Sequence, residues 1–257
     1  MSVKARGDFY YWRIIATGAS FTLFGVGGVI LGFIIFPLVG LLSRDREQAV
    51  LRCRGLVARS FRMFVGFMQN TGVLTWEVEG REHLEQAGIL VVANHPTLID
   101  IVFIIAMIPN ASCIVKPSLY RNIFTRGPVS RAAYVASDEP ESLIEDCVQT
   151  LDTGSSLVIF PEGTRSVQGM PLKFRRGAAH VQRRSGCPVV LVRIRSNPPT
   201  LAKHEKWYQI PATRPHFTLV VEKDQAALVK VPYDGTAPDS RMITRRWREY
   251  FAKEVMA

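Results

Sequence analysis

The N-terminal segment constrains the fold most, because no residue from Ile14 to Leu42 is charged and most of them are apolar. A secretory signal has an apolar region of only about 7–15 residues, followed by a small-residue cleavage site, and no such site follows here. A straight membrane span needs about 20 apolar residues, so this run is long even for one span. We therefore expect a membrane-embedded helical segment rather than a buried helix of a soluble core.

Small residues and a proline interrupt this segment, at Gly25, Gly27, Gly28 and Pro37. Two models fit the pattern: one tilted span, or two short helices that are hinged at the glycines and dip into one leaflet. Basic residues flank both ends, and the heavier cluster follows the segment. Because positive charge is retained on the cytoplasmic side, we expect an inner (cytoplasmic) membrane location with the rest of the chain facing the cytoplasm.

Residues 45–70 have the pattern of an amphipathic helix, in which apolar residues recur at helical spacing and arginines fill many of the other positions. Such a helix can lie in the lipid interface, or it can pack on the domain that follows. Both alternatives remain open from the sequence. We predict two parts, an N-terminal membrane segment with this amphipathic helix over residues 1–70 and a folded catalytic domain over residues 71–257.

From about Val73 short apolar runs alternate with helical stretches, which predicts an α/β domain with a largely parallel central sheet flanked by helices. The expected strands are 73–78, 88–93, 112–115, 132–136, 156–160, 188–195 and 216–222. The expected helices are 97–108, 117–125, 139–152 and 175–185, with a last basic helix from about Asp239.

The charge of the chain favours an anionic partner. Its 257 residues include 32 Lys and Arg against 22 Asp and Glu, for a formal net charge of +10, which suits nucleic acid, an anionic membrane or a phosphorylated substrate. The four cysteines and five histidines show no metal-ligand spacing, so we expect reduced thiols and no metal.

The stretch VVANHPTLID places His95 and Asp100 between two apolar runs. Residues five apart diverge on a regular helix, so the two side chains can meet only if His95 precedes the helix and Asp100 lies in its early turns. Pro96 suits the first helical position. Open α/β sheets place active sites at the carboxyl ends of strands, and a histidine paired with a carboxylate is the arrangement of a general base.

A second polar segment, FPEGTRS at residues 160–166, follows the predicted strand SLVIF. Pro161 and Gly163 predict a loop that carries Glu162, Thr164 and Arg165. Arginine at such a position is suited to a bidentate contact with phosphate. The nearby KFRRG segment adds Lys173, Arg175 and Arg176.

Taken together, NHPTLID, FPEGTRS, KFRRG and CPVVLVRI resemble the four-block signature of the glycerolipid acyltransferases, the lysophosphatidic acid acyltransferase family with its HxxxxD motif. The resemblance covers roughly residues 70–225. It implies that His95 is the general base and Asp100 its partner. It also implies a substrate-binding set made of Lys116, Glu162, Gly163, Thr164, Arg165, Lys173, Arg175 and Arg176.

The implied reaction is acyl transfer from acyl-CoA or acyl carrier protein to the hydroxyl of a lysophospholipid in the bilayer, without a cofactor. The acceptor that best fits the resemblance is 1-acylglycerol 3-phosphate, which gives phosphatidic acid. KPSLYRN and Ser137 depart from the family's usual pattern on the acceptor side. An aminolipid or specialised-pathway acceptor therefore stays open, as does a non-enzymatic lipid-binding scaffold. We expect no nucleic-acid partner, because no motif of that class is present.

Overall fold

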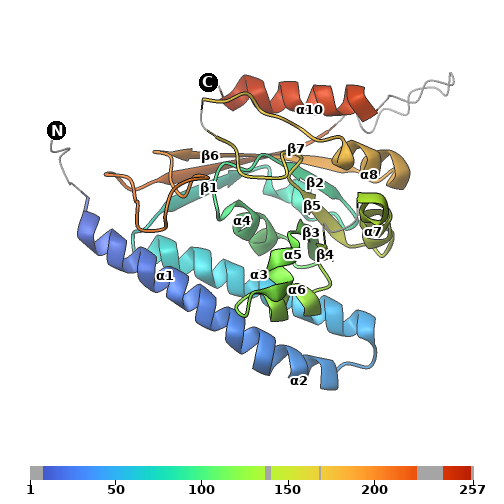
Figure 1. Cartoon of the computed structure of the whole chain (residues 1–257), viewed down its shortest axis with the longest axis horizontal. Helices are drawn as coiled ribbons and strands as arrows, with labels where there is room; N and C mark the ends of the chain where they lie inside the picture. Colours follow the sequence, from blue (N-terminus) through green and yellow to red (C-terminus); the bar gives the residue numbers. More distant parts are fainter. Residues whose placement is uncertain (1–7, 137–139, 168, 225–239, 256–257) are drawn as a thin grey trace.

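The computed structural model describes residues 8–136, 140–167, 169–224 and 240–255, and its centre is a seven-stranded sheet (Figure 1). The strands are β1 (Thr75–Glu79), β2 (Leu90–Ala93), β3 (Ala111–Val115), β4 (Val135–Ala136), β5 (Ser156–Ile159), β6 (Val189–Asn197) and β7 (His216–Lys223). Their order is β1-β7-β6-β2-β5-β3-β4, and every neighbouring pair is parallel except β6 and β7. The predicted fold class, with a largely parallel sheet, is confirmed.

Helices cover both faces of the sheet. The elements are α1 (Tyr10–Ile30), the π-helical η1 (Leu31–Ile35), α2 (Phe36–Leu41), α3 (Arg46–Asn70), η2 (Arg81–Leu84), α4 (Asp100–Met107), α5 (Pro117–Arg121), α6 (Arg126–Arg131), α7 (Pro140–Asp152), α8 (Gly177–Ser185) and α10 (Ser240–Val255). Successive side chains of a strand point to opposite faces. Val91 and Ala93 of β2 accordingly join a core with α3 and α4, whereas Leu90 and Val92 join a second core with α7, α8 and α10.

The uncharged N-terminal segment forms one rod, because α1, η1 and α2 follow each other without a break and lie alongside α3 (Figure 1). Of the two models for this segment, the one with a hinge at Gly25, Gly27 and Gly28 is not observed, since α1 runs through all three. The helical pattern changes instead at η1, where the Phe36 N–H bonds to the Leu31 carbonyl. Pro37 offers no N–H to the carbonyl four residues earlier, and the π-helical turn just before it accommodates that loss.

Glycines of this rod serve close packing. A β-carbon on Gly28 would lie 2.3 Å from the Phe124 carbonyl oxygen, and one on Gly127 would lie 2.2 Å from the Gly32 Cα. The rod therefore touches α6 and the segment before it backbone to backbone. By length and composition the helix Tyr10–Leu41 could cross a membrane.

Of the two alternatives for residues 45–70, packing on the domain is the one observed. Asp45 caps α3 by accepting the Gln48 N–H at 2.7 Å. Arg54 is buried in the domain and donates to the Ala132 carbonyl, to Asn110 and to Ser155 at 2.7–3.0 Å. The apolar side of α3 packs against α4 and α1.

Two predicted helices differ in detail. The stretch 117–125 and the residues after it form the short helices α5 and α6, with a turn at 122–125 between them. The stretch 97–108 becomes helical only at Asp100, so Pro96 is not the first helical residue. Ser137 and Asp239, which the sequence analysis used, lie outside the described residues.

Candidate active site

The site is built on the turn Asn94–Ile99, between the carboxyl end of β2 and the start of α4. The Asn94 side chain extends the pairing of β2 with β6: it accepts the Ile194 N–H at 2.7 Å and donates to the Ile194 carbonyl at 2.8 Å. Both atoms of the amide group are thus used, and the backbone entering His95 is held in place. Nothing in the sequence around Asn94 indicated this role.

His95 and Asp100 meet as predicted, with 2.8 Å between His95 Nδ1 and Asp100 Oδ2. The Asp100 side chain is fully buried, whereas the His95 side chain keeps 19% of its surface exposed. The backbone N–H and the hydroxyl of Thr97 also donate to Asp100. Since the carboxylate accepts all of these bonds, the neutral imidazole carries its proton on Nδ1, and Nε2 is then the nitrogen with a free lone pair.

The late start of α4, at Asp100, follows from the same contacts. A side chain that reaches back to Thr97 and His95 needs a non-helical turn in front of it, so Thr97–Ile99 stay outside α4. Burial raises the pKa of the Asp100 carboxyl, and the bonds from His95 and Thr97 act against that rise. The three donors are what keep a carboxylate at this depth favourable.

An aromatic ring fixes the plane of the imidazole. Phe160, the last residue before the PEGTR loop, stacks on His95 with ring centroids 4.2 Å apart and planes inclined by 22°. In the sequence, Phe160 is only the last residue of the predicted strand SLVIF. The place of β5 beside β2 in the sheet is what brings this ring to the turn.

Glu162 ties the two loops together. Its carboxylate accepts the His95 N–H at 2.9 Å and the Ser166 hydroxyl at 2.7–2.9 Å, and the Ser166 N–H donates to the His95 carbonyl at 2.7 Å. Burial raises the pKa of the Glu162 carboxyl. The side chain predicted to bind substrate is thus engaged within the protein, where it holds the backbone of His95.

Arg165 is also engaged. Its Nη1 donates to the carbonyls of Leu201 and Ala202 at 3.0 and 2.9 Å, and its Nη2 to the Lys203 carbonyl at 3.4 Å. A guanidinium has five N–H donors, so these contacts leave donors for a further acceptor. Leu98 in the catalytic turn donates its N–H to the Leu201 carbonyl as well, at 3.1 Å.

The remaining predicted residues lie at the carboxyl ends of β3 and β5 or in the loop that follows β5. Gly163 has a φ of +67°, and the Arg175 side chain lies over it, while the Arg175 N–H donates to the Pro161 carbonyl at 2.8 Å. Thr164, Lys173 and Arg176 are exposed on the same loop and its continuation. Lys116 is exposed at the carboxyl end of β3, which pairs with β5 in parallel.

Comparison with known proteins gives the same family as the sequence blocks. Residues 75–195 match the acyltransferase family model, which confirms the predicted resemblance. A human 1-acyl-sn-glycerol-3-phosphate acyltransferase alpha is 28% identical over 174 residues, 63% of this chain and 57% of the relative. A 1-acyl-sn-glycerol-3-phosphate acyltransferase of Helicobacter pylori is 35% identical over 96 residues, 35% of this chain and 40% of the relative.

One solved structure shows the same fold over nearly the full length. It is the 1-acyl-sn-glycerophosphate acyltransferase PlsC of Thermotoga maritima, with a TM-score of 0.70, 20% identity and 95% of both chains covered. The matched part of the chain spans about half the length of the curated relatives, between 40% and 57% for the mouse, human and Helicobacter proteins.

Proposed function

Residues 75–195 of this chain match the acyltransferase family, and from this premise we propose that the protein is a membrane-bound O-acyltransferase that acylates a lysophospholipid. The donor is an acyl thioester, acyl-CoA or acyl carrier protein, and the acceptor is 1-acyl-glycerol 3-phosphate. The observation that carries the proposal is the His95–Asp100 pair, in which Nδ1 bonds to a buried carboxylate and Nε2 is left as a base.

In the proposed reaction His95 acts twice, first as a general base and then as a general acid. Nε2 takes the proton of the acceptor hydroxyl as its oxygen attacks the thioester carbonyl. The carbon–sulfur bond then breaks, and the proton passes from Nε2 to the departing thiolate, giving an ester and a free thiol. Asp100 holds the tautomer and stabilises the imidazolium between the two transfers. Glu162 and Phe160 are proposed to position His95, through its backbone N–H and its ring.

We propose that the acceptor phosphate is bound by the cationic edge formed by Lys116, Arg165, Lys173, Arg175 and Arg176. Charge on this edge matches an anionic headgroup, and arginine can hold phosphate through two N–H groups at once. Gly163 and Thr164 lie in the same loop; Gly163 has a positive φ, and because it has no β-carbon the Arg175 side chain can lie over it.

We propose that residues 1–70 form the membrane-binding part and residues 71–257 the catalytic domain. One face of the helix Tyr10–Leu41 packs on α3 and α6, and the other face is exposed and apolar. A transmembrane orientation would carry the exposed arginines of α3 into the hydrocarbon, at a cost of about 2.5–3.5 kcal/mol each. We therefore favour a helix that lies in one leaflet of the inner membrane, with the domain on the cytoplasmic side.

The direct test is a product assay. Purified protein is supplied with acyl-CoA or acyl carrier protein and, in turn, with 1-acyl-glycerol 3-phosphate, an uncharged monoacylglycerol or a lyso-aminolipid, and products are identified by mass spectrometry. We expect phosphatidic acid as the main product. Formation of the acylated aminolipid alone would assign the alternative acceptor, and no acylated product with any acceptor would reject the enzyme.

Arg165→Lys is expected to raise the acceptor KM while leaving the KM of the acyl donor nearly unchanged. Lysine keeps the charge and can still donate to the carbonyls of Leu201 and Ala202, but it lacks the planar fork. A charge-assisted hydrogen bond contributes about 1.5–3 kcal/mol, so kcat/KM for the acceptor should fall on the order of 10–100-fold. Steady-state kinetics with each substrate varied in turn give the answer. An unchanged acceptor KM, with activity on an uncharged lyso-lipid, would contradict a phosphate role.

Val26→Asp is expected to weaken binding to lipid vesicles without unfolding the protein. Val26 lies on the outward face of α1 with 51% of its surface exposed. A carboxylate in the lipid would cost enough to lower the vesicle partition coefficient roughly tenfold or more. Sedimentation with vesicles measures this loss. Met242→Asp, at a 59% exposed position on α10 in the opposite layer, is the matched control and should bind as the wild type does.

A further inference from the structure

The connection between β6 and β7, residues 198–215, crosses the molecule between the catalytic turn and the N-terminal helix. We call it the strap. At one end, the Leu201 carbonyl accepts the Leu98 N–H and an Arg165 N–H. At the other end, the carbonyls of Pro211, Ala212 and Thr213 accept hydrogen bonds from the guanidinium of Arg13 on α1.

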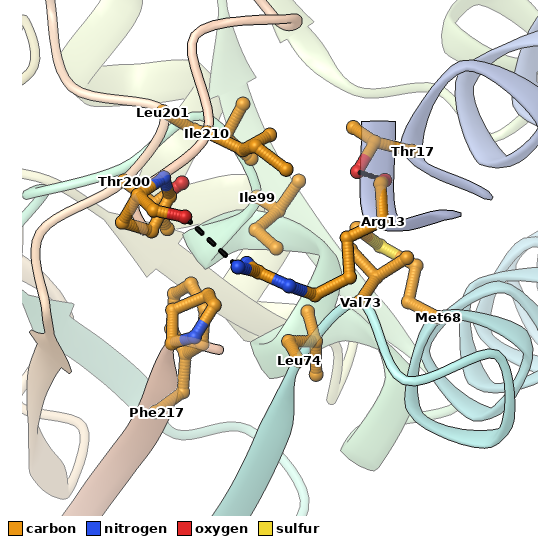
Figure 2. A pocket seen from close by; sticks show the side chains of 12 residues that line it. Arg13, Thr17, Met68, Val73, Leu74, Ile99, Thr200, Leu201, Ile210 and Phe217 are labelled. Atoms are coloured by element: carbon orange, nitrogen blue, oxygen red, sulfur yellow. Dashed lines mark hydrogen bonds between the residues drawn. The ribbon is translucent and has the colours of Figure 1, made fainter. Parts of the chain in front are cut away.

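Arg13 is buried although it sits on the apolar helix, with 2% of its surface exposed. Figure 2 shows its guanidinium extending toward the strap residues Thr200 and Leu201, with Ile99 beside it in the lining of a small cavity. A buried guanidinium is tolerated only where its donors are satisfied, and here strap carbonyls satisfy them. The strap is thus fixed both to the helix proposed to bind membrane and to the turn that carries His95 and Asp100.

The tip of the strap carries two exposed aromatic side chains. Trp207 and Tyr208 each keep 44% of their surface exposed, and their rings meet edge to face at 5.5 Å. The Trp207 ring lies on α1 at Gly18, where a β-carbon would be 3.2 Å from ring atoms. Lys206 places its Nζ 5.7 Å from the centroid of the Tyr208 ring.

We propose that this tip, Lys206–Tyr208, contacts the bilayer surface, and that the strap transmits this contact to the catalytic turn. The proposal rests on the membrane association proposed above. Tryptophan and tyrosine favour the membrane–water interface, and a neighbouring lysine suits anionic headgroups. The tip also lies against the same helix, at Gly18, whose exposed apolar residues include Leu23, Val26, Ile30, Ile34 and Leu38.

The contacts give this coupling a defined route. Lipid that holds Trp207 and Tyr208 reduces the motion of the strap, and Leu201 in the same strap holds the Leu98 N–H three residues after His95. The catalytic turn could then unfold locally only if the hydrogen bond from the Leu98 N–H to the Leu201 carbonyl of the strap also broke. Binding to a bilayer is therefore expected to stabilise the geometry of the His95–Asp100 pair, which makes the protein more active on a surface than in dilute solution.

Lipid contact at the tip can be tested by tryptophan fluorescence. The variant Trp12→Phe/Trp76→Phe retains Trp207 and Trp247, and Trp247 is buried at 1% exposure. Vesicles of anionic phospholipid with brominated acyl chains should quench this variant. The matched variant that also carries Trp207→Phe retains Trp247 and should stay unquenched. Contact of the tip with lipid would be overturned if both variants were quenched equally. It would also be overturned if neither variant were quenched although both sediment with the vesicles.

Coupling to the turn can be tested by hydrogen exchange of the peptide that contains Leu98. In the wild type, anionic vesicles should slow exchange there by about 3–10-fold. The effect should vanish in Trp207→Ser/Tyr208→Ser, which still binds through the helix. Phe124→Ser is the matched control. Phe124 is 49% exposed and lies against Gly25 and Gly28 of the same helix, but within the described chain no hydrogen bond joins residues 122–126 to the turn.

The outcomes separate the two proposals. Slowed exchange in the strap-tip variant, equal to that of the wild type, would overturn the coupling. Failure of every protein to bind vesicles would reject membrane association and the strap contact together. Neither readout requires turnover, so a failed acyl-transfer assay leaves this test intact.

Discussion

Replacing His95 with alanine is expected to lower kcat by about 10²–10⁴-fold, the usual cost of losing a general base. The acceptor hydroxyl would then have no group to take its proton, and the departing thiolate none to supply one. Both substrates should still bind with near wild-type affinity, because the cationic edge and the strap are unchanged. Initial rates at saturating donor and acceptor measure the effect.

The structure offers a control for the fold of this variant. The His95 backbone contacts to Glu162 and Ser166 do not use the imidazole, so His95→Ala should retain the loops and the secondary structure. His83→Ala changes a histidine in η2, outside the catalytic turn, and should have wild-type kcat. Near wild-type turnover in a folded His95→Ala sample would end the proposed mechanism.

Asp100→Asn is expected to cost about 10⁴-fold in kcat, the scale seen where a carboxylate that orients a catalytic histidine is replaced by its amide. Asparagine would present an N–H₂ group where the carboxylate accepts bonds from His95 and from Thr97. The imidazole would then favour the tautomer with Nε2 protonated, and Nε2 could no longer take a proton. A pre-steady-state assay that includes the chemical step measures this loss.

Asp100→Asn should also lower stability, in contrast to His95→Ala. The position is fully buried, so a donor facing another donor cannot be relieved by water, and such a buried mismatch costs about 1–3 kcal/mol. Chemical denaturation reports this difference, with Asp152→Asn at an exposed position as the control. Wild-type activity in Asp100→Asn would show that Asp100 neither orients nor stabilises His95.

The strands were predictable because their signal is local. Most of the strands, such as VVLVRIR in β6, alternate or continue over four to nine residues and end at a turn signal, so their place in the sequence suffices. The strand expected at 132–136 is the exception, since only Val135 and Ala136 are in the sheet. The pairing of His95 with Asp100 was also local, since they are only five positions apart. The start of α4 was predicted too early because Pro96 carries a helix-start signal, whereas the Asp100 side chain draws Thr97–Ile99 into a turn.

Other parts of the site depend on distant contacts that no window of sequence contains. Phe160 reaches His95 only because β5 pairs with β2, and Arg165 reaches Leu201 across 36 positions of the chain. The choice between a lipid-bound and a packed α3 depended on Arg54, whose partners Asn110 and Ser155 lie in loops far along the sequence. An arginine on an amphipathic helix is compatible with a lipid-facing helix and with a helix packed on the domain, until the partners of that arginine are known.

The contact between Gly32 and Gly127 has a consequence for where the enzyme can work. A side chain at either glycine would collide with the opposing backbone, so this contact lets the rod pack directly against α6. With the rod in one leaflet, as proposed above, this packing would set the height of His95 above the lipid. That height would be a fixed property of the folded chain. The acceptor hydroxyl groups that His95 could reach would then be those at one depth of the headgroup layer.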